Sequence, residues 1–145
     1  MAAKIRKFTR RRLIFTLLAF CAAIIVAPSF TLAHEASSIT NVTPEKAKEL
    51  IGNKKIDLIL DVRTPGEYTG PTGNIAGSKL IPVQNLAERI GEIKDYKDKT
   101  VLVYCHSGVR SARSAKILES SGFKNIINME GGIMGWKGKG YKTTK

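Results

Sequence analysis

The segment KTVLVYCHSGVRSARSAKILES, residues 99–120, decides the fold. Lys99 to Tyr104 contains a continuous apolar run, which is typical of a strand buried on both faces of a parallel sheet. Cys105 follows directly. Ser111 to Ser120 has its apolar residues on one side, as in a helix, and Gly122 is placed to end that helix. The segment therefore predicts a strand, a short loop that begins with cysteine, and a helix.

The same alternation of strands and helices continues outward from this segment. Thr43-Pro44-Glu45 supplies an N-cap, an early proline and an early acid, which predicts a helix from Pro44 to Ile51. The lysine-rich tail from Trp136 to Lys145 is expected to be frayed and solvated. The pattern predicts an α/β domain with a parallel sheet and helices on both faces. The other expected elements are strands at 56–62, 79–83 and 123–129, a turn or one-turn helix at 64–67, a helix at 84–93 and a short helix beginning at 131.

Composition and charge fit one globular domain with a basic start. The chain has 145 residues, of which 43% are hydrophobic and 25% are charged. Its formal net charge is +12, and six basic residues precede the first acidic one, Glu35, so the rest of the chain carries +6. The other basic residues are scattered, which does not favour nucleic-acid binding.

Residues 1–33 have the layout of a secretory signal peptide. A basic start is followed by an apolar run from Leu13 to Ala27 and by the small-residue cleavage signature Thr31-Leu32-Ala33. We therefore expect a mature domain at 34–145 and a periplasmic destination, reached by the Sec route rather than by the twin-arginine route that residues 9–14 resemble. An uncleaved membrane anchor is the alternative, because Leu13 to Ala33 has about the ~20 residues that a spanning helix needs.

Cleavage would leave Cys105 as the one cysteine of the mature chain, so no intramolecular disulfide could form. A lone thiol in an oxidising compartment calls for burial, intermolecular pairing or chemistry. The plain alternatives for this region are a buried structural Cys105, solvent-facing Arg110 and His106, and serines that only cap the helix.

The loop after Cys105 favours chemistry. Ligands of open parallel sheets gather at the carboxyl ends of strands, where loops lead into helices. Gly108 permits a tight curl, so that successive backbone N–H groups can surround an anion at the helix N-terminus. A Cys105 thiolate held there beside Arg110 and His106 is expected to have a lowered pKa. The candidate binding residues are His106, Ser107, Gly108, Val109, Arg110 and Ser111.

Four separated motifs stand out along the chain. They are Asp61-Val62-Arg63 with Glu67-Tyr68, Gly73 to Ser78 (GNIAGS), Cys105 to Ser111 (CHSGVRS), and Gly131-Gly132-Ile133 before Trp136. Together they resemble the rhodanese-like domain family, over about residues 38–141, and they occur in family order and with family spacing. The closest likeness is to small, single-domain, exported thiosulfate sulfurtransferases.

The resemblance implies a three-layer fold with a five-stranded parallel sheet, in which Cys105 carries sulfur. Its thiolate would attack the outer sulfur of thiosulfate, sulfite would leave, and the persulfide would pass its terminal sulfur to cyanide or a thiol. Residues 106–111 would bind the anionic donor and the persulfide. No metal or organic cofactor is required, and a monomer is expected that contacts a membrane only if residues 1–33 are retained.

Two features depart from the family pattern. Asn74 stands where the family usually has histidine, and the link from Thr69 to Thr72 is slightly longer than in the shortest members. Both lie in a loop that is expected to border the site, so they bear on the choice of acceptor. Asp61, Arg63 and Glu67 match the pattern and are expected to form a structural network of ion pairs and turns.

Two other functions compete with sulfur transfer from thiosulfate. A cysteine phosphatase or arsenate reductase also places a cysteine and an arginine around an oxyanion. Phosphatase loops have five residues between the two, whereas four separate Cys105 from Arg110, and the shorter loop suits a single sulfur. The other alternative is a persulfide carrier or redox-binding module that serves a partner protein, which the sequence leaves open.

Overall fold

The computed structural model describes residues 38–145, so the predictions for residues 1–33 lie outside the described part of the chain. Within 38–145, no helix is both long and apolar enough to cross a membrane. The elements are β1 (Ile39–Val42), α1 (Pro44–Gly52), β2 (Leu58–Asp61), α2 (Pro65–Thr69), β3 (Lys79–Leu80), the 3-10 helix η1 (Ile90–Tyr96), β4 (Thr100–Tyr104), α3 (Val109–Ser120), β5 (Asn125–Met129) and α4 (Gly132–Gly138).

The five strands form one sheet in the order β1-β5-β4-β2-β3, and every pairing is parallel. This arrangement confirms the five-stranded parallel sheet that the family resemblance implied. In the register, Asp61 of β2 lies opposite Tyr104 of β4. The carboxyl ends of these two strands therefore meet at one edge, so the residues that follow them are brought together.

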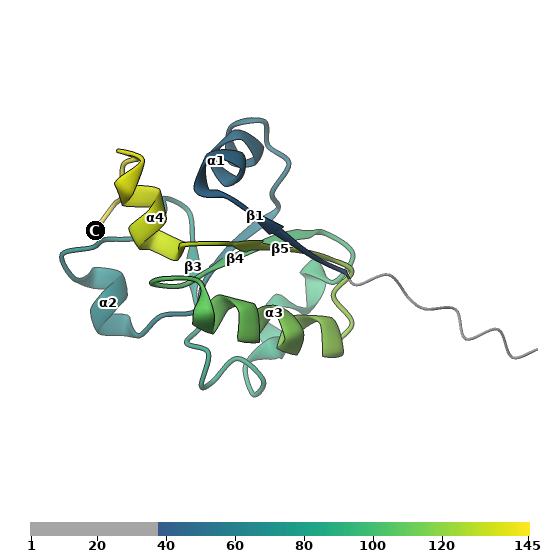
Figure 1. Cartoon of the computed structure of the whole chain (residues 1–145). Helices are drawn as coiled ribbons and strands as arrows, with labels where there is room; N and C mark the ends of the chain where they lie inside the picture. The colour runs from purple at the N-terminus through teal and green to yellow at the C-terminus, as the bar shows by residue number, and fades with distance from the viewer. Residues whose placement is uncertain (1–37) are drawn as a thin grey trace, which may run out of the picture. The chain divides into compact units, whose positions relative to one another are not determined.

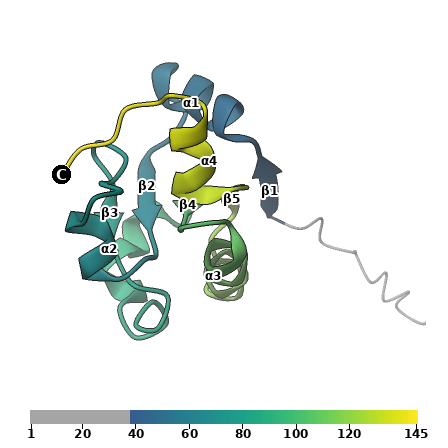
Figure 2. The same ribbon diagram turned by 60° about the vertical axis from the view of Figure 1, so that its left-hand side comes forward.

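Helices cover both faces of the sheet, as Figures 1 and 2 show: α1 and α4 lie on one face and α3 on the other. On the α3 face, Ala115 and Leu118 pack with alternate residues of the strands, such as Val101 and Val103. On the opposite face, α1 and α4 pack on the intervening strand residues, such as Leu102. Because β4 is buried from both sides, its apolar run is continuous, as the sequence indicated.

Two elements differ from the sequence-based expectation. The helix expected at 84–93 is a series of turns that leads into η1 at Ile90–Tyr96. Leu86 and Ile93 are fully buried, so the apolar spacing was interpreted correctly as a core-facing side. These side chains reach the core although the segment is not an α-helix. Short-range backbone hydrogen bonds, such as the 3.0 Å bond from the Glu92 N–H to the Arg89 carbonyl, form turns that place apolar residues on one side. The other difference is β1, a strand where the sequence indicated only a lead-in.

The tail from Trp136 to Lys145 is largely exposed, as expected, but the expectation that it is frayed is wrong. Trp136 is 2% exposed, and its indole N–H donates to the Lys142 carbonyl over 3.0 Å. The Tyr141 ring packs edge-on against Trp136, with 5.0 Å between the ring centroids. Farther along, Thr144 and Asn74 exchange two backbone hydrogen bonds of 2.8 Å in an antiparallel bridge. The tail is ordered because its apolar rings and its backbone both find partners.

Candidate active site

Cys105 lies at the carboxyl end of β4, in the loop that leads into α3. The backbone N–H of Gly108 donates a hydrogen bond to its Sγ atom over 3.1 Å. Gly108 has a φ of 106°, in the left-handed region that favours glycine, and this conformation curls the loop back toward the sulfur. The residue is free and 1% exposed, so its thiol is shielded by the loop that holds it.

The first turn of α4 is hydrogen-bonded to this loop. The backbone N–H groups of Ile133 and Met134 donate to the carbonyls of Cys105 and His106, over 2.8 and 3.1 Å. These carbonyls are thereby turned toward α4, while the Gly108 N–H faces the sulfur. Gly131-Gly132-Ile133 matches the family pattern, but nothing in the spacing of this motif predicts that it supports the Cys105 loop.

Replacing Gly132 by alanine is expected to deform the loop and to destabilise the protein by about 2 kcal/mol or more. A Cβ atom at Gly132 would clash with the Cys105 carbonyl oxygen, and the φ of 55° at Gly132 is costly for any residue with a side chain. The check is urea denaturation of both proteins together with a sulfur-transfer assay. Gly138→Ala is the matched control, because a Cβ there meets nothing within 4 Å. Equal stability of the two variants would contradict the expectation.

The electrostatics of the loop favour the thiolate form of Cys105. Burial alone would raise the pKa of the thiol, but hydrogen bonds to the sulfur outweigh burial and lower the pKa below its ordinary value. The largest of these contributions come from the hydroxyl and backbone N–H of Ser111, followed by the N–H groups of Gly108 and Ser107. The Gly108 N–H bonds directly to the sulfur over 3.1 Å, and the lowered pKa favours the thiolate, which is the nucleophilic form of cysteine.

The Ser111 hydroxyl also lies 3.0 Å from the Gly108 carbonyl, to which it donates a hydrogen bond. A hydroxyl has one proton, so we expect it to turn to the sulfur when Cys105 ionises. Ser111→Ala is therefore expected to raise the pKa of Cys105.

The measurement is a titration of thiolate ultraviolet absorbance, from which that of a Cys105→Ser variant is subtracted. Ser114→Ala is the control, because this second buried hydroxyl of α3 donates to the Arg110 carbonyl over 2.9 Å. A midpoint that Ser111→Ala leaves in place would refute the role of its hydroxyl.

Arg110 lies in an ion pair that the sequence did not indicate. Its two terminal nitrogens donate to the carboxylate oxygens of Glu67 on α2, over 2.6 and 2.7 Å. His106 Nδ1 lies 3.8 Å from the same carboxylate. Of the other predicted binding residues, Val109 turns its side chain outward and is 77% exposed, and Ser107 is also exposed. The T-x-x-E spacing of Thr64 and Glu67 is typical of a capping box, but it does not indicate that Glu67 pairs with Arg110.

Asp61 and Arg63 form the structural network that was expected of them. Both side chains are fully buried, and Arg63 Nη2 lies 2.6 Å from Asp61 Oδ2. Arg63 also donates to the carbonyls of Gly73 and Glu67, over 2.7 and 3.3 Å, and to the Thr72 hydroxyl over 3.0 Å. The pair therefore ties the end of β2 to α2 and to the following loop, which sets the position of Glu67.

Asn74, one of the two departures from the family pattern, is engaged with the tail. Its side chain accepts a hydrogen bond from the Thr144 hydroxyl at 2.8 Å and donates to the Tyr68 carbonyl at 3.3 Å. Nearby, the Tyr104 hydroxyl accepts from the Ile75 N–H over 3.1 Å. These bonds give Asn74 a structural role in the loop.

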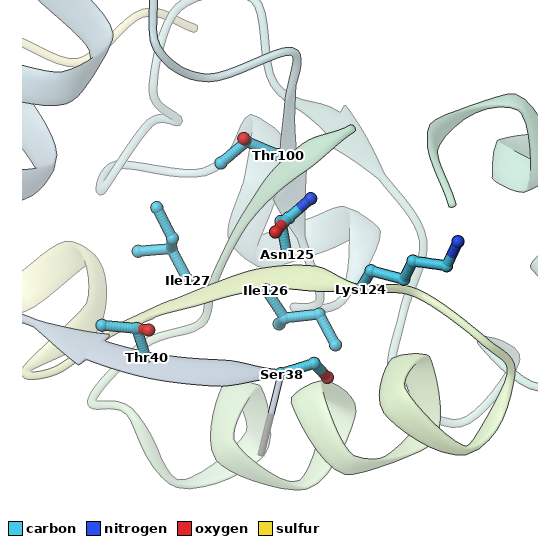
Figure 3. Close-up of a pocket in the computed structure, with 7 residues that line it drawn as sticks. All are labelled: Ser38, Thr40, Thr100, Lys124, Asn125, Ile126 and Ile127. Atoms are coloured by element: carbon cyan, nitrogen blue, oxygen red, sulfur yellow. The ribbon is translucent and has the colours of Figure 1, made fainter. Parts of the chain in front are cut away.

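One cavity of about 380 Å³ adjoins the Cys105 loop, and another lies at the opposite end of the sheet. The remote cavity measures about 340 Å³ and has Thr100 and Asn125, the first residues of β4 and β5, in its wall (Figure 3). The cavity beside the loop is lined by Asn41, Ser107, Gly108, Val109, Ala112, Asn128, Glu130 and Gly131.

Within residues 38–145, no group of three or more His, Cys, Asp and Glu side chains could hold a metal ion.

Within residues 38–145, the fold and the loop together define an α/β domain in which Cys105 follows β4 and accepts a hydrogen bond from its own loop. Comparison with known proteins then specifies the family, because the model of the Rhodanese-like domain matches residues 43–139. The chain belongs to the rhodanese-like domain family.

Relatives of this chain include both uncharacterised proteins and a sulfurtransferase. It is 36% identical over 118 residues to uncharacterized protein YqhL of Bacillus subtilis, covering 81% of this chain and 88% of YqhL. It is 30% identical over 98 residues to a protein of Allochromatium vinosum named sulfurtransferase, covering 68% and 88% of the two chains. A crystal structure of a rhodanese-related protein from Thermoplasma volcanium has a TM-score of 0.62 at 34% identity, covering 70% and 94%.

Proposed function

We propose that the protein is a sulfurtransferase that moves sulfane sulfur from thiosulfate, through a Cys105 persulfide, to cyanide or a thiol. The observation that carries the proposal is the 3.1 Å hydrogen bond from the Gly108 N–H to Cys105 Sγ. N–H groups arranged in this way stabilise the thiolate before attack and the persulfide anion after it. The similarity to the sulfurtransferase of Allochromatium vinosum supports the same chemistry.

The reaction needs two displacements at sulfur. The Cys105 thiolate attacks the outer sulfur of thiosulfate, the S–S bond breaks, and sulfite leaves with the bonding electron pair. Cyanide or a thiolate then attacks the terminal sulfur of the persulfide, and the Cys105 thiolate is restored. Neither displacement of this kind requires the protein to supply a proton.

A second candidate is a persulfide carrier that delivers its sulfur to a partner protein. Two large hydrophobic side chains at the loop favour it: Val109 is 77% and Met134 is 48% exposed. Val109 begins α3 directly after the loop, and Met134 donates its N–H to the loop carbonyl of His106. Exposed apolar groups beside a reactive atom suit contact with a protein surface.

The test is the intact mass of the purified protein before thiosulfate, after thiosulfate, and again after cyanide. We expect a gain of one sulfur atom that cyanide removes. No gain on folded protein with a free Cys105 would overturn the proposal, and hydrolysis of an aryl phosphate would then favour the phosphatase alternative. When the protein is purified from an exported fraction, the same spectrum tests our further proposal that residues 1–33 are a cleaved export signal.

A further inference from the structure

The Glu67 carboxylate lies at the loop that carries the reactive sulfur. It reaches two residues of that loop, since Arg110 donates to it over 2.6 and 2.7 Å and His106 Nδ1 lies 3.8 Å away. Glu67 comes from α2, which follows β2, so the fold brings this negative charge to the site from a neighbouring strand end.

This carboxylate is firmly held and stays ionised. Besides the two bonds from Arg110, Glu67 Oε2 accepts from the backbone N–H and the hydroxyl of Thr64, over 3.1 and 3.0 Å. Arg110, followed by Thr64, outweighs partial burial and lowers the pKa of Glu67 to about 2. The carboxylate is therefore anionic at any pH at which a sulfur-transfer assay is run.

The ion pair changes the charge that a sulfur donor meets. Both terminal nitrogens of Arg110 are directed at Glu67, so they do not form an open fork for an oxyanion. The formal charges of Arg110 and Glu67 cancel. Among Cys105, Arg110 and Glu67, the negative charge of the Cys105 thiolate is therefore left uncompensated. The nearby Asp61–Arg63 pair is also neutral overall. A dianionic donor is disfavoured by this arrangement more than a monoanionic one, because Coulomb energy scales with the donor's charge.

We infer that Glu67 sets the donor specificity of the site, by disfavouring dianionic thiosulfate relative to sulfane donors of lower charge, such as thiosulfonates. This inference rests on the proposed function. The bond changes are the same for both donor classes: the Cys105 thiolate attacks the outer sulfur, the S–S bond breaks, and sulfite or a sulfinate leaves with the electron pair. Glu67 acts through Arg110 and is a positioning residue.

The experiment compares kcat/KM for thiosulfate with kcat/KM for methanethiosulfonate, with cyanide as the acceptor for both. In Glu67→Gln, we expect the ratio of the two values to rise about three- to tenfold, the Coulomb effect of one nearby charge in partly solvated surroundings. Glutamine retains a capping-box side chain at the third helical position, so α2 is preserved. High salt should shrink the rise, since it screens the charge.

Two controls separate charge from structure. Glu67→Asp keeps the charge, so its ratio should stay near that of the unmodified protein. Asp98→Asn removes an exposed carboxylate that pairs with Lys124. Asp98 precedes β4 and Lys124 precedes β5, so this pair lies at the end of the sheet opposite Cys105. The substitution should therefore leave the ratio of the two kcat/KM values unchanged. A purely structural role of Glu67 would change both kcat/KM values together and leave their ratio constant.

The outcomes distinguish this inference from the proposed function. An unchanged ratio in Glu67→Gln, with both donors still forming the persulfide, would overturn the donor specificity and leave sulfur transfer standing. A protein that forms no persulfide from either donor would overturn the proposed function and the inference with it.

Discussion

Replacing Cys105 by serine is expected to abolish sulfur transfer, with a loss of about 10³-fold or more. A hydroxyl ionises far less readily than a thiol, and the structure offers it N–H donors rather than an adjacent base. The measurement is the rate of thiocyanate formation from thiosulfate and cyanide, accompanied by the intact mass. The variant should gain no sulfur atom from thiosulfate.

Folding should survive this substitution, which makes the loss interpretable. Serine is similar in shape to cysteine, and its oxygen can accept the hydrogen bond that Gly108 donates to the sulfur. Urea denaturation should therefore give a free energy of unfolding within about 1 kcal/mol of the original. Substantial turnover by a folded Cys105→Ser protein would show that the reaction proceeds without the persulfide.

Replacing Arg63 by methionine is expected to destabilise the protein by about 3–5 kcal/mol. Methionine fills similar space, but it leaves the fully buried Asp61 carboxylate without its cation. The substitution also removes the donors to the Gly73 carbonyl and the Thr72 hydroxyl, so the loop that follows α2 should loosen. Urea denaturation measures the stability, and limited proteolysis reports on residues 70–73.

Arg89→Met makes the same chemical change at an exposed ion pair. Arg89 and Glu92 pair at 2.6 Å with side chains 41% and 40% exposed, so solvent compensates most of the loss. We therefore expect a loss of stability that is much smaller than that of Arg63→Met. If both substitutions had equally small effects, burial of the Asp61–Arg63 pair would not contribute as described.

The segment around Cys105 was predictable because its signals are local. A strand buried on both faces requires an apolar run, and a tight loop before a helix favours glycine. The strand, the loop and the helix of residues 99–120 could therefore be predicted from these residues alone. Asp61 and Arg63 were also correctly assigned to a structural network, since an acid and a base two residues apart can pair within one strand end.

The features that the sequence did not indicate depend on contacts between distant segments. β1 is polar at Thr40 and Asn41, both exposed, and it is a strand because β5 pairs with it. The tail is ordered because Thr144 meets Asn74, and Arg110 is paired because α2 brings Glu67 to it. No local spacing marks such partners, because the T-x-x-E spacing of Thr64 and Glu67 corresponds only to the capping box at the start of α2.

The pairing of β1 with β5 has a consequence for the speed of folding. Asn41 and Asn128 bond side chain to side chain across a sequence separation of 87 residues, from the first strand of the described chain to the last. A sheet edge that closes over so long a loop has a high entropic barrier, so refolding is expected on the slow, millisecond-to-second side for a domain of this size. A ribosome must also release the chain beyond Met129 before this edge can form, so the sheet is completed late in synthesis.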